Sequence, residues 1–73
     1  MNTGELFGKE VLDMNANSVG KVSDIDFDIM QGAISHIVVK AGLSKKYYVN
    51  IDKIEKIGDK VILNIDKDKI AKG

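Results

Sequence analysis

The 73 residues of this chain are enough for one small domain, which buries only about 60% of the surface that its unfolded chain exposes. Eleven lysines and no arginine balance eleven acidic residues without a long run of either sign, which argues against direct binding to nucleic acid. Cysteine is absent and no apolar run exceeds three residues, so the sequence excludes a disulfide framework and membrane insertion and favours a cytoplasmic protein.

The first elements are a short strand and a turn. Leu6 and Phe7 are the first side chains large enough to anchor a fold, and we expect residues 1–4 to fray. Residues 9–14 predict a short strand. Residues 15–18 predict a turn into the next strand, because asparagine tolerates left-handed backbone and serine can bond to its own chain.

The second strand has one solvated face. Ile25, Phe27 and Ile29 alternate with aspartates, which is the two-residue period of a half-buried strand. Val22 is out of phase with this alternation. A β-bulge near Ser23 would place Val22 on the same side as Ile25 and bend the strand, as a small barrel requires.

The third strand, predicted over residues 33–40 after a tight glycine turn, has apolar residues on both faces. Ile34 and Val38 lie on one face, with Ile37 and Val39 on the other. Both faces therefore need cover.

The fourth strand contains two adjacent tyrosines, Tyr47 and Tyr48, which must point to opposite sides, so one ring is expected inside. Asp52 followed by Glu55 resembles a capping box and predicts one short helical turn near residues 52–57. A last strand over 61–65 places Ile62 opposite its other apolar residues, and we expect residues 67–73 to fray.

Short strands divided by turns every eight to twelve residues predict an all-β fold, a small barrel or a curled sheet, in a single domain of residues 1–73. Proline is absent, so nothing in the sequence blocks strand pairing at the sheet edges. Those edges are open to another chain.

The order and spacing of these elements resemble the PRC-barrel family over about residues 5–66. The residues that carry the resemblance are Leu6, Gly8, Val11, Asp13, Val19, Gly20, Val22, Asp24, Gly32, Ile34, Val38, Val39, Ile54, Ile57, Gly58, Asp59 and Val61.

This resemblance implies a small open barrel of five or six short antiparallel strands with no enzymatic activity, no catalytic residues and no cofactor. Members of the family include the C-terminal half of a ribosome maturation factor, which binds a small-subunit protein. Others are free-standing archaeal domains, some of which resemble cell-division adaptors that bind SepF, the membrane anchor of FtsZ. Without a second domain, this chain resembles the free-standing archaeal type.

The aspartates of the second strand invite comparison with a calcium-binding EF-hand loop, which begins with alternating acidic residues. The comparison fails because Ile29 stands where the loop needs glycine and Ser35 where it needs a bidentate glutamate. We therefore expect no metal site. His36 is the only histidine and has no second ligand or nucleophile close in sequence, so we interpret it as a surface or interface residue rather than a catalytic one.

A protein interface is the site that the sequence favours. A barrel this small hides one side of each strand, so Ile37, Val39 and Ile62, or their counterparts if the phase is reversed, must lie outside. The outward ring of Tyr47 or Tyr48 either is covered by the tail of the chain or meets another protein, because tyrosine is enriched at binding hot spots.

The leading hypothesis is a non-enzymatic protein–protein interaction module. It would be a dimeric adaptor, either a homodimer or a heterodimer with a related PRC-barrel, acting in archaeal cell division through SepF. The alternative is an RNA-metabolism or ribosome-assembly factor that binds a ribosomal protein.

Overall fold

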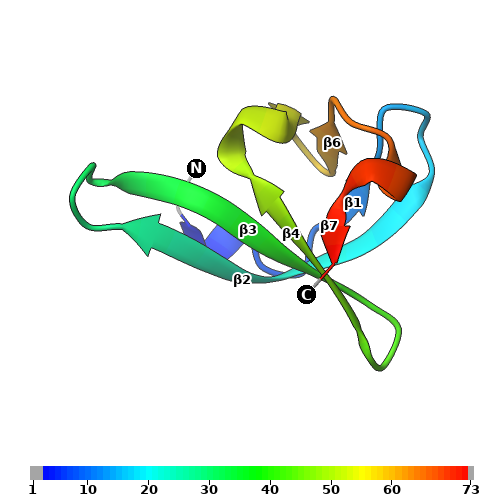
Figure 1. Cartoon of the computed structure of the whole chain (residues 1–73), viewed down its shortest axis with the longest axis horizontal. Helices are drawn as coiled ribbons and strands as arrows, with labels where there is room; N and C mark the ends of the chain where they lie inside the picture. The colour runs from blue at the N-terminus through cyan, green and yellow to red at the C-terminus, as the bar shows by residue number, and fades with distance from the viewer. Residues whose placement is uncertain (1–2, 73) are drawn as a thin grey trace.

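A computed structural model describes residues 3–72 of the chain, which fold into short strands and single 3-10 turns (Figure 1). In chain order the elements are η1 (Thr3–Glu5), β1 (Glu10–Leu12), β2 (Ser18–Asp28), β3 (Ala33–Ala41), β4 (Lys45–Asn50), η2 (Ile51–Lys53), β5 (Ile54–Ile57), β6 (Val61–Leu63), η3 (Lys67–Lys69) and β7 (Ala71–Lys72).

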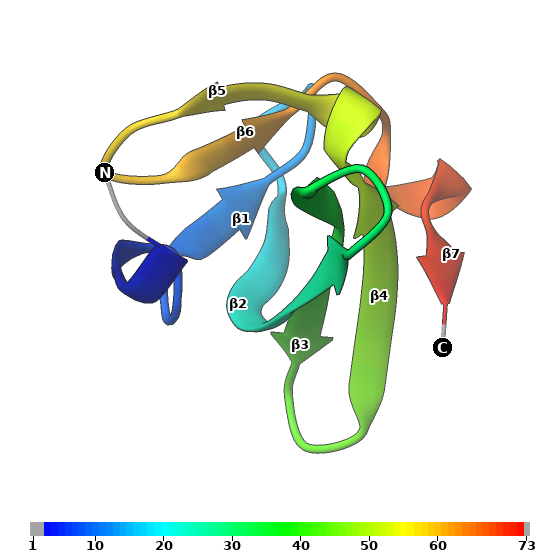
Figure 2. The same cartoon turned by 90° about the vertical axis from the view of Figure 1, so that its left-hand side faces the viewer.

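One mixed sheet contains all of these strands, in the order β5-β6-β1-β2-β3-β4-β7. The sheet curls so that β5, β6 and β1 face β2, β3 and β4 across the interior, and β5 and β7 are not paired with each other (Figure 2). The expected all-β open barrel is therefore confirmed. Two details differ from the expectation: β7 adds a short seventh strand, and β1 pairs with β6 in parallel rather than antiparallel.

The predicted bulge in β2 is also confirmed. The register between β2 and β3 shifts between Val22 and Asp24, which buries Val22 and lets Ile25 pack against the core. Such a bulge bends a strand and increases its twist, which helps the sheet to curl.

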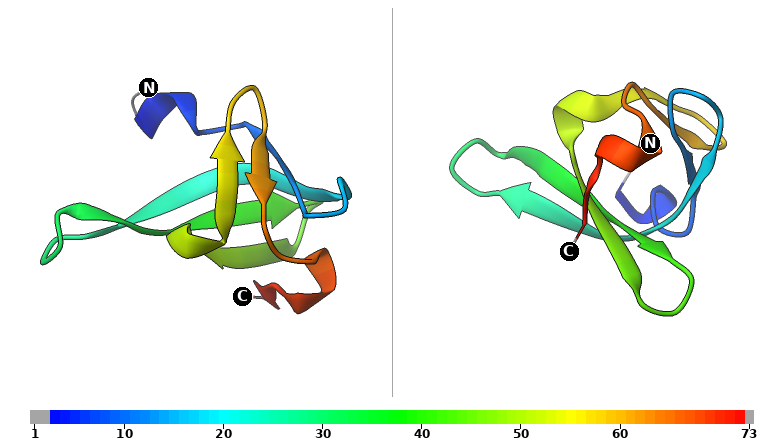
Figure 3. Two further views of the ribbon diagram at one scale, coloured as in Figure 1. Left: turned by 90° about the horizontal axis from the view of Figure 1, so that it is seen from above. Right: turned by 45° about the vertical axis from the view of Figure 1, so that its right-hand side comes forward.

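The β2–β3 hairpin extends well beyond the barrel as an arm over residues 25–34 (Figure 3). The reason is a difference in strand length, because β1 pairs with β2 only as far as Lys21 and β4 pairs with β3 only from His36 onward. At its tip the Asp28 carboxylate accepts hydrogen bonds from the N–H groups of Met30 and Gln31, which closes the turn.

Residues 54–57 correct one expectation. They form strand β5, and only Ile51–Lys53 are helical, in the 3-10 turn η2. The spacing of Ile54 and Ile57 suits a helix, but a bulge between Ile54 and Lys56 places both residues against the core from a strand.

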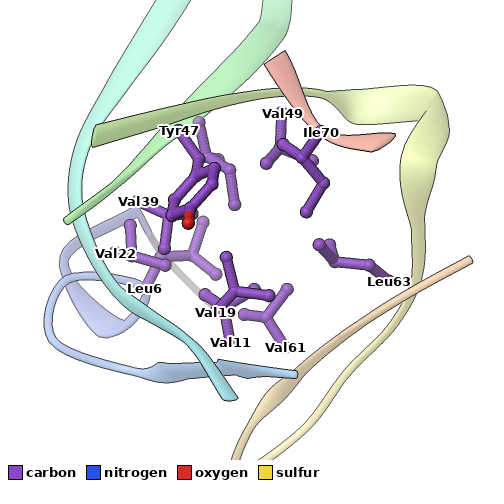
Figure 4. Packing of buried hydrophobic residues seen from close by; sticks show 11 residues of the cluster. Leu6, Val11, Val19, Val22, Val39, Tyr47, Val49, Val61, Leu63 and Ile70 are labelled. Carbon is purple, nitrogen blue, oxygen red and sulfur yellow. The ribbon is translucent and has the colours of Figure 1, made fainter. Parts of the chain in front are cut away.

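The C-terminal segment is a second correction, because residues 67–72, which we expected to fray, form η3 and β7. The Asp66 carboxylate caps η3 by accepting from the N–H of Asp68, and Ile70 is buried in the core beside Val49 (Figure 4). Residues 3–4, also expected to fray, belong to η1, whereas residues 1, 2 and 73 lie outside the described residues.

The interior of the barrel is filled by the side chains of its own strands and of the two terminal segments (Figure 4). The buried cluster consists of Leu6, Val11, Val19, Val22, Ile37, Val39, Tyr47, Val49, Val61, Leu63 and Ile70. Aliphatic side chains dominate this set, so the fold is stabilised mainly by the removal of apolar surface from water.

One charged side chain, Asp13, is buried with this core and joins the turn after β1 to η3. Its carboxylate accepts hydrogen bonds from the N–H groups of Asn15, Asn17 and Lys67 at 2.8–3.0 Å, and from the side-chain amide of Asn17 at 3.3 Å. Burial by itself raises the pKa of Asp13, but the hydrogen bonds from Lys67, Asn17 and Asn15 outweigh it and hold the pKa below its ordinary value.

Candidate functional site

The outer face of β2, β3 and β4 carries charged, polar and aromatic side chains close together. Residues directly opposite each other on neighbouring strands point to the same side of a sheet, so the strand registers define rows across this face. From β2 through β3 to β4, the basic row is Lys21, Lys40 and Lys46, the middle row is Asp24, Val38 and Tyr48, and the third row is Asp26, His36 and Asn50.

His36 has partners that the sequence analysis did not foresee. Its Nε2 lies 2.5 Å from Asp26 Oδ2, its Nδ1 lies 3.2 Å from Ser35 Oγ, and the edge of its ring meets the Tyr48 ring at 5.8 Å between centroids. These partners come from three strands and are brought together by register alone. The contacts fix the orientation of the outward Tyr48 ring.

Ser35, His36 and Asp26 share the residue types of a catalytic triad, but their hydrogen bonds serve another purpose. The Ser35 hydroxyl donates to the main-chain carbonyl of Asp26 at 3.2 Å, across the β2–β3 pair. A nucleophilic serine has to give its proton to the histidine instead. The group therefore ties β3 to β2 at the base of the arm.

Among residues 3–72, the lysines of the basic row take part in neither of the two close ion pairs, although Glu10 on β1 lies directly opposite Lys21. These pairs join His36 to Asp26 and Lys60 to Glu10. Like charges directly opposite on neighbouring strands destabilise a sheet. Beside the row, a shallow hollow of about 350 Å³ is lined by Ser23, Asp24, Asp26, Val38, Lys40, Lys46 and Tyr48.

Most of the interface residues that the sequence suggested lie elsewhere. Ile37 and Val39 are buried in the core, so the expectation that they lie outside is wrong, and Tyr47 is buried with them. The phase of β3 is the reverse of the assumed one, because its outward positions are those of His36 and Val38. Ile62 is half-buried on β6. Of the five suggested residues, Tyr48 alone lies on the outer face, where it is 42% exposed.

The burial of Ile37 leads to a stability prediction. Replacing Ile37 with valine removes one buried methylene, and we expect the free energy of unfolding to fall by about 0.5–1.5 kcal/mol. Urea denaturation measures this change. The matched control is Ile29→Val at the tip of the arm, where the side chain is 87% exposed and the same change should leave stability unaltered. Equal losses in both variants would contradict the burial of Ile37.

The sequence analysis missed the exposed apolar side chains at the two hairpin tips. Ile29 and Met30 project from the arm, with Phe27 half-exposed behind them, and Leu43 is 98% exposed in the β3–β4 turn. Ile29 and Phe27 follow the buried alternation of β2, so the sequence pattern placed them inside. The missing signal was the length of the arm, which carries them beyond the barrel.

The family model of the PRC-barrel domain matches residues 1–70 of this sequence. The chain belongs to the PRC-barrel family. No curated protein matches the sequence. The PRC barrel is a non-catalytic domain family, and membership in it suggests a small interaction module.

One glycine and one aspartate of the PRC-barrel pattern, Gly20 and Asp13, have clear roles in this structure. Gly20 lies where β2 crosses close to β3: a Cβ there would collide with the carbonyl oxygen of Lys40 and lie 2.9 Å from its carbon. Asp13 anchors the C-terminal segment. Both residues therefore shape the barrel rather than a site on it.

In the part of this PRC barrel that the structure describes, no three acidic or histidine side chains are placed to hold a metal ion. Asp24, Asp26 and Asp28 have separate partners: the N–H of Ile25, the ring of His36 and the turn of the arm. Within residues 3–72 there is also no helix with the length and hydropathy needed to span a membrane.

Proposed function

We propose that this PRC barrel is a non-enzymatic protein-interaction module that works as a dimeric adaptor. The observation that supports this most strongly is the contrast between the filled interior of the barrel and its exposed apolar side chains. The interior is filled by the chain's own side chains, whereas Tyr48 and the apolar residues at both hairpin tips remain exposed. Neighbouring exposed apolar side chains, such as Phe27, Ile29 and Met30 on the arm, mark a surface for association on a small protein.

The outer face suits binding better than catalysis. Its aromatic ring is fixed by His36, and aromatic side chains held in place by their neighbours give contact area at a low entropy cost. The hydroxyl of Ser35 is engaged with main chain, and the hollow beside Tyr48 is shallow rather than enclosed. Binding sites for small substrates are instead deep and largely closed around their ligands.

Within this proposal, the role to test first is archaeal cell division, with SepF as the partner. The support for it is the match of the chain to a family that includes archaeal cell-division adaptors. The partner surfaces of the chain are the exposed tips and the outer face, and a homodimer or a heterodimer with a related PRC-barrel would present two copies of them. Two copies allow an adaptor to bridge partners.

The test combines self-association with binding to purified SepF. Sedimentation equilibrium over a wide concentration range should show reversible dimers, and titration calorimetry should show saturable binding to SepF. A strict monomer that binds neither SepF nor any protein from its native cells would overturn the adaptor proposal. Co-sedimentation with ribosomal subunits that persists at moderate salt would instead indicate ribosome assembly and contradict the cell-division role.

A further inference from the structure

We infer that the β3–β4 turn docks on the surface of an anionic lipid bilayer, with Leu43 reaching into the headgroup layer and the lysines around it meeting lipid phosphates. The inference goes beyond the proposed function, which concerns protein partners, and does not depend on it. The binding is peripheral, because the turn touches one leaflet and does not cross it.

The shape of the turn carries the first step. Residues 42–44 connect β3 to β4 and lie at one end of the molecule, beyond the barrel (Figure 2). Leu43, in the middle of this turn, is 98% exposed. A protein partner would have to supply a pocket for this side chain, and leucine is under-represented among the hot spots of protein interfaces. The headgroup layer of a bilayer accepts an apolar side chain without a preformed pocket.

The charges around Leu43 carry the second step. Residues 29–51 contain no acidic residue, and their three lysines, Lys40, Lys45 and Lys46, flank the turn. Lys40 and Lys46 lie opposite each other and share one face of the hairpin, whereas Lys45 points to the other face. Each lysine is within three positions of Leu43, which limits the distance along the backbone to about 11 Å. The lysines therefore surround the tip, and this favours docking with the tip toward the bilayer.

Two hollows beside the turn give room for lipid headgroups. One, of about 580 Å³, is lined by Lys21 and Lys40, the other has a volume of about 390 Å³, and Lys67 borders both. Among the described residues, Glu10, opposite Lys21, is the one acidic side chain that lines either hollow. Its carboxylate is held by Lys60 at 2.8 Å, so the lysines of the hollows remain available to phosphates.

The carboxylates of the outer face lie farther from the tip. Asp24 is opposite Val38 and Asp26 is opposite His36, which places them two and four positions farther along β3 than Lys40. Two further carboxylates, on Asp66 and Asp68, adjoin Lys67 in η3, so the charge of that lysine counts for less than those of the hairpin. Because the chain has no net charge, this uneven distribution decides which end turns toward an anionic surface.

The arm tip provides a contrast within the same molecule, because it is as exposed as the β3–β4 turn but acidic. Met30 is 93% exposed, and residues 22–39 contain three aspartates and no lysine. An anionic surface therefore attracts the β3–β4 turn and repels the arm. The arm remains free for protein partners.

The binding should be weak, reversible and dependent on salt. Each lysine close to an anionic surface strengthens binding several-fold, and this attraction falls off within a Debye length of about 8 Å at physiological salt. A single leucine adds less than a fatty-acyl chain, which by itself gives only marginal binding. Nucleic acid also offers phosphates, but it has no apolar layer for Leu43.

Flotation with vesicles tests the charge dependence. The natural chain should bind vesicles of equimolar phosphatidylglycerol and phosphatidylcholine, should dissociate as salt is added, and should not bind vesicles of phosphatidylcholine alone. Lys45→Gln with Lys46→Gln should weaken binding at least about tenfold. The matched control, Lys53→Gln with Lys56→Gln, changes lysines of η2 and β5 at the opposite end of the molecule and should leave binding unchanged (Figure 2).

Fluorescence tests the orientation. The chain contains no tryptophan, so Leu43→Trp is a unique reporter at the tip. On the anionic vesicles its emission should shift to the blue and be quenched by brominated lipid, because the ring enters the headgroup layer. Met30→Trp, at the arm tip, should show neither effect. Circular dichroism checks the fold of all variants.

Three results would overturn the inference. The first is a natural chain that stays in solution with the anionic vesicles, or a variant with both Lys45→Gln and Lys46→Gln that binds them as tightly. The second is vesicle binding that shifts the emission of Met30→Trp instead of Leu43→Trp. The third is preference for a single-stranded oligonucleotide over vesicles at equal phosphate concentration, which would assign the lysines to nucleic acid. The adaptor proposal is decided separately, by self-association and SepF binding.

Discussion

Gly20→Ala should leave most of the chain unfolded at room temperature. The backbone at Gly20 has φ +151°, which side chains rarely adopt, and the added Cβ would collide with the main chain of Lys40. Backbone strain and forced separation of β2 from β3 together cost about 2–5 kcal/mol. A single small core supplies only about 3–5 kcal/mol of stability, so the loss removes most of it.

Two other glycines separate the causes of this loss. Gly42→Ala tests a positive φ of 64° where nothing lies within 4 Å of the new Cβ, and Gly58→Ala tests an open site without a positive φ. Urea denaturation should rank Gly20→Ala as far more damaging than Gly42→Ala, with Gly58→Ala close to the natural chain. If Gly20→Ala and Gly42→Ala lose equal stability, the close approach of β2 and β3 at Gly20 is wrong.

Asp13→Asn should lower the melting temperature by more than about 10 °C at neutral pH. The buried carboxylate accepts four hydrogen bonds from the turn after β1 and from Lys67, and an asparagine amide cannot accept all of them. The loss should also loosen η3, because Lys67 begins that turn. Thermal melts followed by circular dichroism measure the effect.

The same carboxylate makes stability depend on pH. Its pKa in the folded chain is below the ordinary value of 3.8, so the unfolded chain binds the proton more readily. The stabilisation from Asp13 is present above pH 3.8 and is lost as the pH falls through the lower pKa of the folded state. Asp13→Asn should flatten this part of the acid unfolding curve, whereas Asp59→Asn, at an exposed site, should not. Parallel curves for both variants would contradict this role of Asp13.

The sequence predicted the fold where local patterns were sufficient. The alternation in β2 with Val22 out of phase indicated a bulge, and the bulge is there. The pair Tyr47 and Tyr48 indicated one ring inside and one outside, which the structure confirms. These predictions succeeded because strand side chains alternate regardless of which strands are neighbours.

The other features depended on contacts between distant segments. Ile37 and Val39 could face either way until the pairing of β3 with β2 and β4 fixed the phase. The spacing of Ile54 and Ile57 fits both a helical turn and a bulged strand, and pairing with β6 selects the strand. The tail is ordered through Lys67, which bonds to a carboxylate 54 positions earlier in the chain. None of these partners is local.

The candidate site was the least predictable part. Tyr48 is exposed, and its role at an interface stays a prediction. Its neighbour His36 acquires Asp26 as a partner only through the register of β2 and β3. The basic row likewise joins lysines from three strands. The sequence therefore did not show that three lysines lie side by side at one end of this face.

The most direct test is the self-association of the natural chain. Sedimentation equilibrium over a wide concentration range should show reversible dimers. A chain that stays strictly monomeric at high concentration, and that binds neither SepF nor any other protein from its native cells, would contradict the account.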